Sequence, residues 1–319
     1  MKAVLVSQAG GSEVLELVDR PLPQVKPGWS LIKIKGFGIN RSEIFTRQGY
    51  SPSVTFPRVL GIECVGRIAE STDESRLPLG QKVLSTMGEM GRAFDGSYAE
   101  YVLVPNEQIF PVETDLSWEE FAAVPETYFT AYGSMLQLRL EDGDRVLVRG
   151  AASGVGLAFT KLVKAKYPQL KVYGSVRRLD KEAQLLAQGY DGIIQELDGL
   201  LRTDMTFNKV LELVGPSVIK DSIAHMDAYG VICSTGLLGG QWYLEDFDPT
   251  FDLKKNIYLT TFYSGNVSSE QWQSLFDYIE NYQVDVRPEK IFSLDQIRAA
   301  HDYLDSPQAL GKIIVLNDD

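Results

Sequence analysis

The chain has 319 residues and a net charge of −12, with 44% hydrophobic and 23% charged residues. This composition is typical of a globular protein, and the length suits two domains better than one. The acidic balance argues against a nucleic-acid or anionic-membrane surface, because phosphate groups would be repelled. No apolar run approaches the ~20 residues of a membrane span, and the N-terminus lacks the pattern of a secretory signal.

Residues 1–118 have the pattern of a β-rich domain. Short apolar and β-branched runs alternate with proline and glycine, as in barrel-like folds. The expected strands are 2–6, 13–18, 31–39, 62–69, 82–84 and 98–104, with one short helix at 42–47. The two cysteines, Cys64 and Cys233, both stand in apolar segments and are expected to be buried thiols. This favours a reducing compartment and therefore a cytoplasmic protein.

Residues 119–261 change to alternating helices and buried strands, the pattern of a parallel sheet. The expected strands are 146–148, 172–175, 193–194, 210–214, 231–234 and 257–262. Helices are expected at 181–187, 270–282 and 294–304, and a closing strand at 312–316 returns to the first domain.

A glycine-rich turn follows the first of these parallel strands. Val146–Val148 lead into Gly150-Ala-Ala-Ser-Gly154-Val-Gly156, and helical spacing resumes at Leu157. A strand, a tight glycine turn and a helix together aim backbone N–H groups at a phosphate. A lone glycine turn is also compatible with an ordinary strand–helix connection.

The end of the next strand supports the nucleotide interpretation. An acidic residue there would bind the ribose hydroxyls of NAD, whereas this chain has Ser175, Arg177 and Arg178, with Lys181 one turn later. Guanidinium groups pair bidentately with phosphate, so this segment favours NADPH. The alternative is a solvated basic loop.

Several segments, taken in order, resemble the zinc-free quinone oxidoreductases of the medium-chain dehydrogenase/reductase superfamily. These segments are Gly38–Asn40, Arg47–Tyr50, Pro57–Gly66, Asp95–Tyr101, Thr130–Tyr132, Ala151–Gly156, Ala300–His301 and Gly311–Leu316. The resemblance runs nearly end to end. It implies an α/β protein with a doubly wound Rossmann sheet at 119–261. It also implies a GroES-like catalytic domain at 1–118, completed by 262–319, with the active site in the cleft between the domains.

The resemblance also assigns site residues. Positions matching Asn40, Tyr50 and Thr130 line the nicotinamide pocket in such relatives. The pyrophosphate is held by positions matching Ala152, Ser153, Gly154 and Val155, next to Gly156. The later strands contribute Gly236, Leu237, Phe262, Tyr263 and Ser264. Relatives pair through the edge strands of their Rossmann sheets, which predicts a homodimer.

Zinc is not expected. Zinc-dependent relatives need cysteine, histidine and carboxylate ligands, but Asn40 and Arg41 stand where a ligand cysteine would be, and Gly61–Glu63 where a His-Glu pair would be. The chain's two histidines, His225 and His301, lie far apart and are interpreted as surface or supporting residues. Without a Lewis acid, the easier hydride acceptor is a quinone or an α,β-unsaturated carbonyl (an enal or enone), because the developing charge is delocalised.

The expected function is therefore an NADPH-dependent reductase of a small electrophile. Tyr50 would polarise or protonate the substrate and Asn40 would position it; alternatively, Tyr50 only packs against the nicotinamide ribose. Two other functions stay open. One is an NADPH-binding redox sensor or structural protein with little turnover. The other is an enoyl-thioester reductase, for which Arg41, Arg47 and Arg58 would form a basic entrance.

Overall fold

The structure is a computed structural model that describes residues 1–318, and its contacts divide the chain into two compact units. Unit 1 comprises Met1–Thr127 and the segment from Val286 onward, and unit 2 is Tyr128–Asp285. The division predicted from the sequence, after residues 118 and 261, falls earlier in the chain at both points. The contact boundaries lie later because helix α2 (Trp118–Ala123) packs on strands of unit 1, while helix α8 (Ser269–Asn281) packs within unit 2. The functional domain boundaries stay a prediction.

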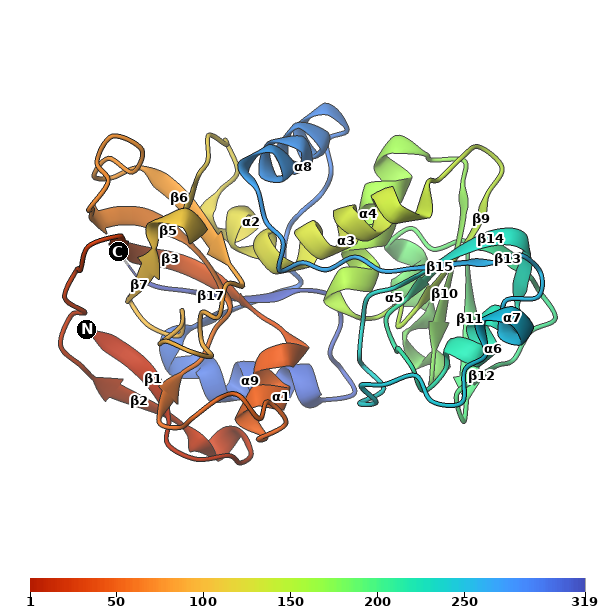
Figure 1. Ribbon diagram of the computed structural model, residues 1–319, viewed down its shortest axis with the longest axis horizontal. Coiled ribbons are helices and arrows are strands. Elements are labelled where there is room, and N and C mark those ends of the chain that lie inside the picture. The colour runs from red at the N-terminus through yellow and green to blue at the C-terminus, as the bar shows by residue number, and fades with distance from the viewer. Residues whose placement is uncertain (319) are drawn as a thin grey trace. The chain divides into compact units, whose positions relative to one another are not determined.

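Unit 1 is β-rich, as expected (Figure 1). Its strands are β1 (Lys2–Val6), β2 (Leu15–Asp19), β3 (Trp29–Ile39), β4 (Arg58–Val59), β5 (Glu63–Glu70), β6 (Lys82–Thr86), β7 (Tyr101–Pro105), β8 (Phe110–Pro111), β16 (Lys290–Ser293) and β17 (Ile313–Leu316). Its α-helices, besides α2, are α1 (Arg41–Arg47) and α9 (Ile297–Asp305). One sheet has the order β2-β1-β4, and a second has the order β16-β17-β3-β5-β6-β8 with β7 also paired to β3.

The closing strand does return to the first unit. β17 pairs antiparallel with β3, with Ile313 opposite Ile39 and Leu316 opposite Gly36. A continuous apolar core joins these strands to α9, and includes Phe37, Val83 and Ile297. Short apolar and β-branched runs, separated by proline and glycine, are what made this unit predictable from its sequence.

Unit 2 is a doubly wound parallel sheet. Its strands are β9 (Arg145–Arg149), β10 (Lys171–Val176), β11 (Gly192–Leu197), β12 (Leu200–Leu201), β13 (Phe207–Glu212), β14 (Met226–Ser234) and β15 (Tyr258–Thr260). Its helices are α3 (Pro125–Leu138), which begins just before the unit boundary, α4 (Gly154–Lys166), α5 (Glu182–Ala187), α6 (Ile219–Ala224), α7 (Pro249–Asp252) and α8.

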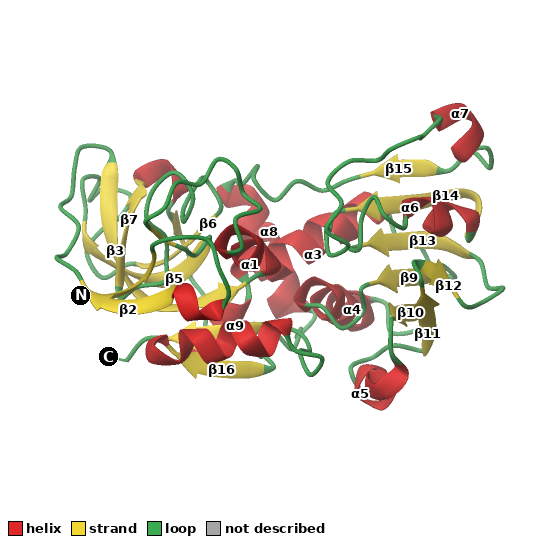
Figure 2. Cartoon of the chain, turned by 90° about the horizontal axis from the view of Figure 1, so that it is seen from below, coloured by secondary structure: helices red, strands yellow, loops and turns green. Residues whose placement is uncertain are grey.

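The strand order of this sheet is β12-β11-β10-β9-β13-β14-β15 (Figure 2). All neighbours are parallel except β11 and β12, which form a short antiparallel pair. Without β12, this is the 3-2-1-4-5-6 order of dinucleotide-binding sheets, with the switch point between β9 and β13. The predicted fold class is confirmed.

Some boundaries differ from the expectation for local reasons. The strand expected to reach residue 214 ends at Glu212, because its carboxylate accepts hydrogen bonds from the N–H groups of Val214 and Gly215 and closes a turn. The two-residue strands β4, β8 and β12 were missed, since no periodicity can show in so short a run. Among residues 1–318, no helix has the length and apolar content to cross a membrane.

Candidate cofactor and substrate site

The glycine-rich turn lies at the carboxyl end of β9, in the centre of the unit 2 sheet. The Ser153 side chain caps α4: its hydroxyl donates to the Gly150 carbonyl (2.7 Å) and accepts from the Gly156 N–H (3.1 Å). Gly150 has a φ of +86°, a left-handed conformation that favours glycine. A β-carbon on Gly156 would stand 2.7 Å from the Gly150 carbonyl oxygen. The turn is therefore closed so tightly that Gly156 has no space for a side chain.

The predicted cofactor residues of unit 2 lie at the carboxyl ends of parallel strands. Four successive segments share this position, after β9, β10, β14 and β15 respectively: Ala152–Gly156, Ser175–Lys181, Gly236–Leu237 and Phe262–Ser264. Because the carboxyl ends of parallel strands meet at one edge of the sheet, these four segments lie along the same edge. Thr130, on α3, lies one turn before Ser134, whose hydroxyl contacts that of Thr235 beside Gly236 (3.0 Å).

The ring of Phe262 lies against α3. It packs against Phe129 with ring centroids 5.5 Å apart, and a β-carbon on Gly133 would clash with it. By contrast, Leu237 and Tyr263 are exposed, so both side chains are accessible to a ligand and their cofactor contacts stay predictions.

The basic segment after β10 is only partly engaged. Arg177 and Arg178 are both exposed. The guanidinium of Arg178 pairs with Asp180 two residues later (2.5 Å). Burial lowers the pKa of Lys181, which is half-buried. Arg177 is therefore the stronger candidate for binding an added phosphate.

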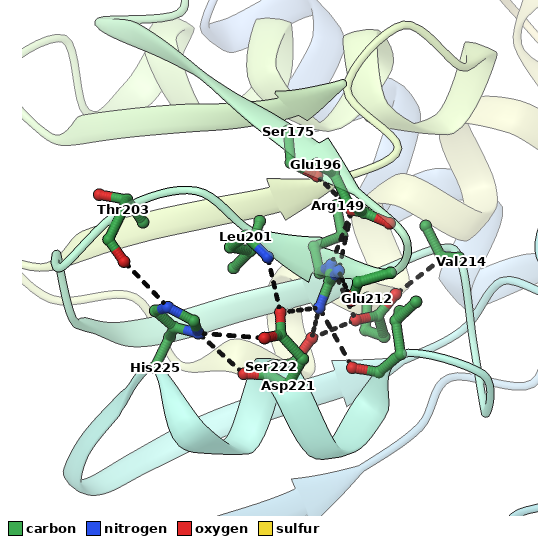
Figure 3. Close-up of polar contacts among 12 residues, drawn as sticks. Arg149, Ser175, Glu196, Leu201, Thr203, Glu212, Val214, Asp221, Ser222 and His225 are labelled. Atoms are coloured by element: carbon green, nitrogen blue, oxygen red, sulfur yellow. Dashed lines mark hydrogen bonds and ion pairs between the residues drawn. The ribbon is translucent and has the colours of Figure 1, made fainter. Parts of the chain in front are cut away.

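An acid close to this segment turns inward. Glu196 is only 7% exposed, and its carboxylate pairs with the fully buried guanidinium of Arg149 (2.9 Å; Figure 3). The same carboxylate accepts a hydrogen bond from the hydroxyl of Ser175 (3.2 Å). Glu196 therefore has a cationic partner and does not present an unpaired charge to a ligand at the end of β10.

Asn40, in unit 1, is held by a buried ionic cluster. Its amide oxygen accepts from the ammonium of Lys312 (2.7 Å), and its amide nitrogen donates to Glu63 (2.8 Å) and Glu43 (3.3 Å). Lys312 also pairs with Glu63 at 2.6 Å. A β-carbon on Gly38 would overlap this ion pair, which explains why residue 38 is a glycine. Both amide hydrogens of Asn40 are thus already engaged within this cluster, which fixes its orientation. Its role in positioning a substrate stays a prediction.

One ammonium faces two carboxylates in this cluster. Burial, followed by the nearby charge of Glu63, raises the pKa of Glu43 to about 7, while Lys312 opposes the shift. Near neutral pH the Glu43 carboxyl is therefore close to half-protonated. A proton can be held or released here, next to Asn40.

Tyr50 follows α1 and is 60% exposed. Its ring makes an edge contact with Phe45, with centroids 6.3 Å apart. This exposure is compatible both with contact to a substrate and with packing against a cofactor, so both interpretations of Tyr50 remain open.

His301 is fully buried, so of its two expected roles, surface residue or supporting residue, the structure excludes the first. Arg47 approaches its Nδ1 (3.2 Å) and the hydroxyl of Tyr98 approaches its Nε2 (3.0 Å). Arginine only donates, so Nδ1 must accept and the neutral ring carries its proton on Nε2. Burial, with the charges of Arg47 and Arg41, lowers the pKa of His301 to about 3.

The residues of unit 1 do not fit a catalytic zinc. Asn40 and Glu63 stand where zinc-dependent relatives would have ligands. Here both side chains are already bound to the ammonium of Lys312, a cation that competes with a metal ion. Across residues 1–318, no group of three or more histidine, cysteine and acidic side chains has the arrangement of a metal site. Burial raises the pKa of the Cys64 thiol, which disfavours its thiolate form.

Two family profiles match the chain. Residues 26–114 match the alcohol dehydrogenase GroES-like domain, and residues 188–315 match a family described as zinc-binding dehydrogenase. The quinone oxidoreductase of Lama guanicoe is 31% identical over 220 residues, which cover 67% of this chain and 63% of that protein. The aligned part is thus less than two thirds of that relative's length.

Solved structures of other proteins resemble the fold of nearly the whole chain. The quinone oxidoreductase of Coxiella burnetii is 25% identical, with a TM-score of 0.82 and 99% of each chain covered. A mycobacterial protein solved as a complex with NADPH has the same TM-score and coverage at 24% identity, which establishes likeness of fold.

A parallel sheet with a glycine turn at its switch point and a β-rich second unit define the fold of the medium-chain dehydrogenases and reductases. Within that superfamily, the chain is similar to proteins named quinone oxidoreductase.

The buried charges were missed by the sequence analysis. Arg149 and Lys312 each stand at the end of an apolar strand, where a basic residue is ordinarily solvated. Their carboxylate partners come from segments distant in sequence, so no local sequence pattern could predict these ion pairs.

Proposed function

We propose that the protein is an NADPH-dependent reductase that transfers hydride to a quinone or an α,β-unsaturated carbonyl without a metal ion. The observation that carries the proposal is the carboxyl edge of the unit 2 sheet. There the glycine turn meets the N-terminus of a 13-residue helix, and Arg177 is exposed after the next strand while Glu196 turns away to Arg149. This arrangement fits a pyrophosphate with an additional 2′-phosphate on the adenosine side.

When bound, NADPH supplies a hydride from its nicotinamide ring. The chain's own residues bind and orient the reactants. The helix N-terminus and the backbone of the turn hold phosphate, and Asn40, fixed by Lys312 and Glu63, presents a rigid polar group. Tyr50 polarises or protonates the acceptor. Reduction of a quinone or an enone leaves an anion that must gain a proton, and Glu43 lies beside Asn40 as a nearby proton store.

The thioester-reductase alternative is weakened by the three arginines on which it depended. Arg41 pairs with Asp305 (2.5 Å), and the buried Arg47 contacts His301 and the same Asp305. Arg58 pairs with Asp95 (3.1 Å). All three arginines therefore have partners within unit 1, which leaves a less basic entrance for a coenzyme or carrier-protein phosphate.

The sensor alternative is separated from the reductase by turnover. Purified protein is incubated with NADPH and a panel of quinones, enals and enones, and the loss of NADPH absorbance is followed. Sustained oxidation with at least one acceptor supports the reductase. Tight NADPH binding without oxidation of any acceptor would favour the sensor.

The first prediction concerns cofactor choice. NADPH is expected to bind at least about tenfold more tightly than NADH, an effect of ~1.4 kcal/mol, because a guanidinium at position 177 pairs with the 2′-phosphate. Arg177→Ala should remove most of this preference by weakening NADPH binding alone. Arg178→Ala, whose side chain is already paired with Asp180, should have a smaller effect. Fluorescence titration with both cofactors measures the ratio, and equal binding by the parent protein would refute the assignment.

The second prediction concerns assembly. We propose a homodimer formed through β15, the edge strand of the unit 2 sheet, where Tyr258 is 60% exposed. Light scattering at micromolar concentration should give twice the 35.5 kDa mass of one chain. Tyr258→Asp should shift the mass toward the monomer, whereas Tyr243→Asp, at another exposed tyrosine outside the sheet, should not. A monomeric parent protein would count against the proposal.

A further inference from the structure

Arg149 is a fully buried arginine at the carboxyl end of β9, immediately before the glycine-rich turn. All three guanidinium nitrogens have partners. Nε donates to Glu196 (3.1 Å), and Nη2 donates to the Gly199 carbonyl (3.0 Å) and pairs with Glu196. Nη1 donates to Asp221, Ser222 and the carbonyl of Val218, each within 3.1 Å. One side chain thus ties β9 to the β11–β12 hairpin and to α6 (Figure 3).

One branch from Arg149 runs to the end of β10. Glu196 accepts from the guanidinium and also from the hydroxyl of Ser175. The carbonyl of Ser175 in turn accepts from the N–H of Ala151 in the glycine turn (3.1 Å). This branch therefore fixes the strand end from which the Arg177 segment departs.

A second branch runs to the segment after β14. The Nε atom of Arg149 lies 3.8 Å from the carboxylate of Glu212, and Ser222 bridges the two by hydrogen bonds. The other oxygen of that carboxylate accepts from the N–H groups of Val214 (2.8 Å) and Gly215 (3.1 Å). Burial raises the pKa of Glu212, while the charge of Arg149 opposes this shift and favours the ionised form.

The turn that Glu212 closes carries the next segment directly. The N–H of Gly236 donates to the carbonyl of Glu212 (3.2 Å), and that of Leu238 donates to Leu213 (3.0 Å). A β-carbon on Gly236 would stand 2.2 Å from the Leu213 carbonyl oxygen, so the two backbones are in direct contact. Any displacement of the turn is therefore transmitted to Gly236 and Leu237.

We infer that Arg149 is a positioning residue that holds two borders of the cofactor site in register. Through Glu196 it holds the adenosine-side border after β10. Through Glu212 it holds the Gly236–Leu237 border, which we assign to the nicotinamide side because Thr235 contacts Ser134, one turn after Thr130 on α3. This inference rests on the proposed NADPH function. Arg149 does not itself touch the ligand in this scheme. It acts through two carboxylates whose own hydrogen bonds shape the two borders.

The test separates the two branches with half-ligands. Adenosine 2′,5′-bisphosphate probes the adenosine side, reduced nicotinamide mononucleotide probes the nicotinamide side, and NADPH probes both. Glu196→Gln is expected to weaken the bisphosphate and NADPH by about tenfold, the loss of a charge-assisted hydrogen bond, while leaving the mononucleotide unchanged. Glu212→Gln is expected to weaken the mononucleotide and NADPH and to leave the bisphosphate unchanged. Arg149→Lys, which keeps the charge but loses the fork geometry, should weaken all three ligands.

Arg145→Lys is the matched control, because Arg145 lies at the opposite end of the same strand and pairs with Asp227 in an exposed position. It should bind all three ligands like the parent. Thermal melts fix a temperature at which each protein is folded, and if Arg149→Lys does not fold, the two glutamine variants decide the test. Parental binding by both glutamine variants would overturn the inference while leaving the proposed function intact. A parent protein that does not bind NADPH would instead refute the proposed function.

Discussion

Gly156→Val is expected to weaken NADPH binding at least about a hundredfold, roughly 2.7 kcal/mol. Gly156 lies in the first turn of α4, where the helix N-terminus faces the proposed pyrophosphate. A β-carbon there would stand 2.7 Å from the Gly150 carbonyl oxygen and 3.1 Å from that of Ala151. Because both neighbours are backbone atoms, the turn itself must move, and its N–H groups no longer point toward the proposed phosphate position.

The structure also revises the expected cost to the fold. From the sequence alone, the substitution would cost only what a β-branched residue near the surface costs, roughly 1–2 kcal/mol. A β-carbon this close to the Gly150 carbonyl overpacks the turn. We therefore expect a loss of stability of about 3 kcal/mol, at the upper end of the range for overpacking substitutions. Thermal melts beside cofactor titrations measure both effects on the same samples.

Gly49→Ala is the control for replacing a glycine in the other unit. Gly49 has a φ of +88°, so alanine strains the backbone and should lower stability by about 1 kcal/mol. It should not change NADPH binding as Gly156→Val does. If Gly156→Val binds NADPH like the parent, residues 150–156 are not the phosphate site, and the proposed function loses its main support.

The second large effect is loss of stability in acid, caused by His301. The pKa of this histidine is lowered from 6.5 to about 3, so the unfolded chain takes up a proton below pH 6.5 that the folded chain refuses until about pH 3. The stability contribution is fully present above pH 6.5 and is lost as the pH falls through this window. The shift corresponds to roughly 5 kcal/mol as an upper limit. Protonation would turn Nδ1 into a donor facing the guanidinium of Arg47, which accounts for the direction.

Denaturant unfolding from pH 7.5 to 3.5 checks this expectation. His301→Asn keeps an acceptor for Arg47 but cannot titrate, so it should be less stable than the parent at neutral pH and show a flatter decline in acid. His225→Asn, which removes the chain's other histidine, should keep the parental slope. Glu43 contributes an opposite trend, because its raised pKa of about 7 costs stability as the pH rises from 4.5 to 7. An acid slope that His301→Asn leaves unchanged would show that His301 is not its source.

Much of the fold was predictable because its signals are local. Runs such as Val146–Val148 and Ile313–Val315 are apolar and rich in β-branched residues, and burial of the whole run follows from that composition. The strand, turn and helix around Gly150–Gly156 were predictable for the same reason, since glycine is required where backbone atoms approach closely. The strand order and the return of β17 to β3 also agree with the expected family.

The sequence by itself thus determined the element types, the α/β class and the segments that we propose to bind a nucleotide. Only the tertiary structure decided the charge partners. Lys312 meets Asn40 and Glu63, Arg149 meets Glu196 and Glu212, and each partner comes from a distant segment. Hydrophobic periodicity records which face of an element is buried, but an ion pair depends on where two chain segments meet in space. The buried guanidinium and ammonium groups, which orient the candidate site, therefore had no signal in the sequence.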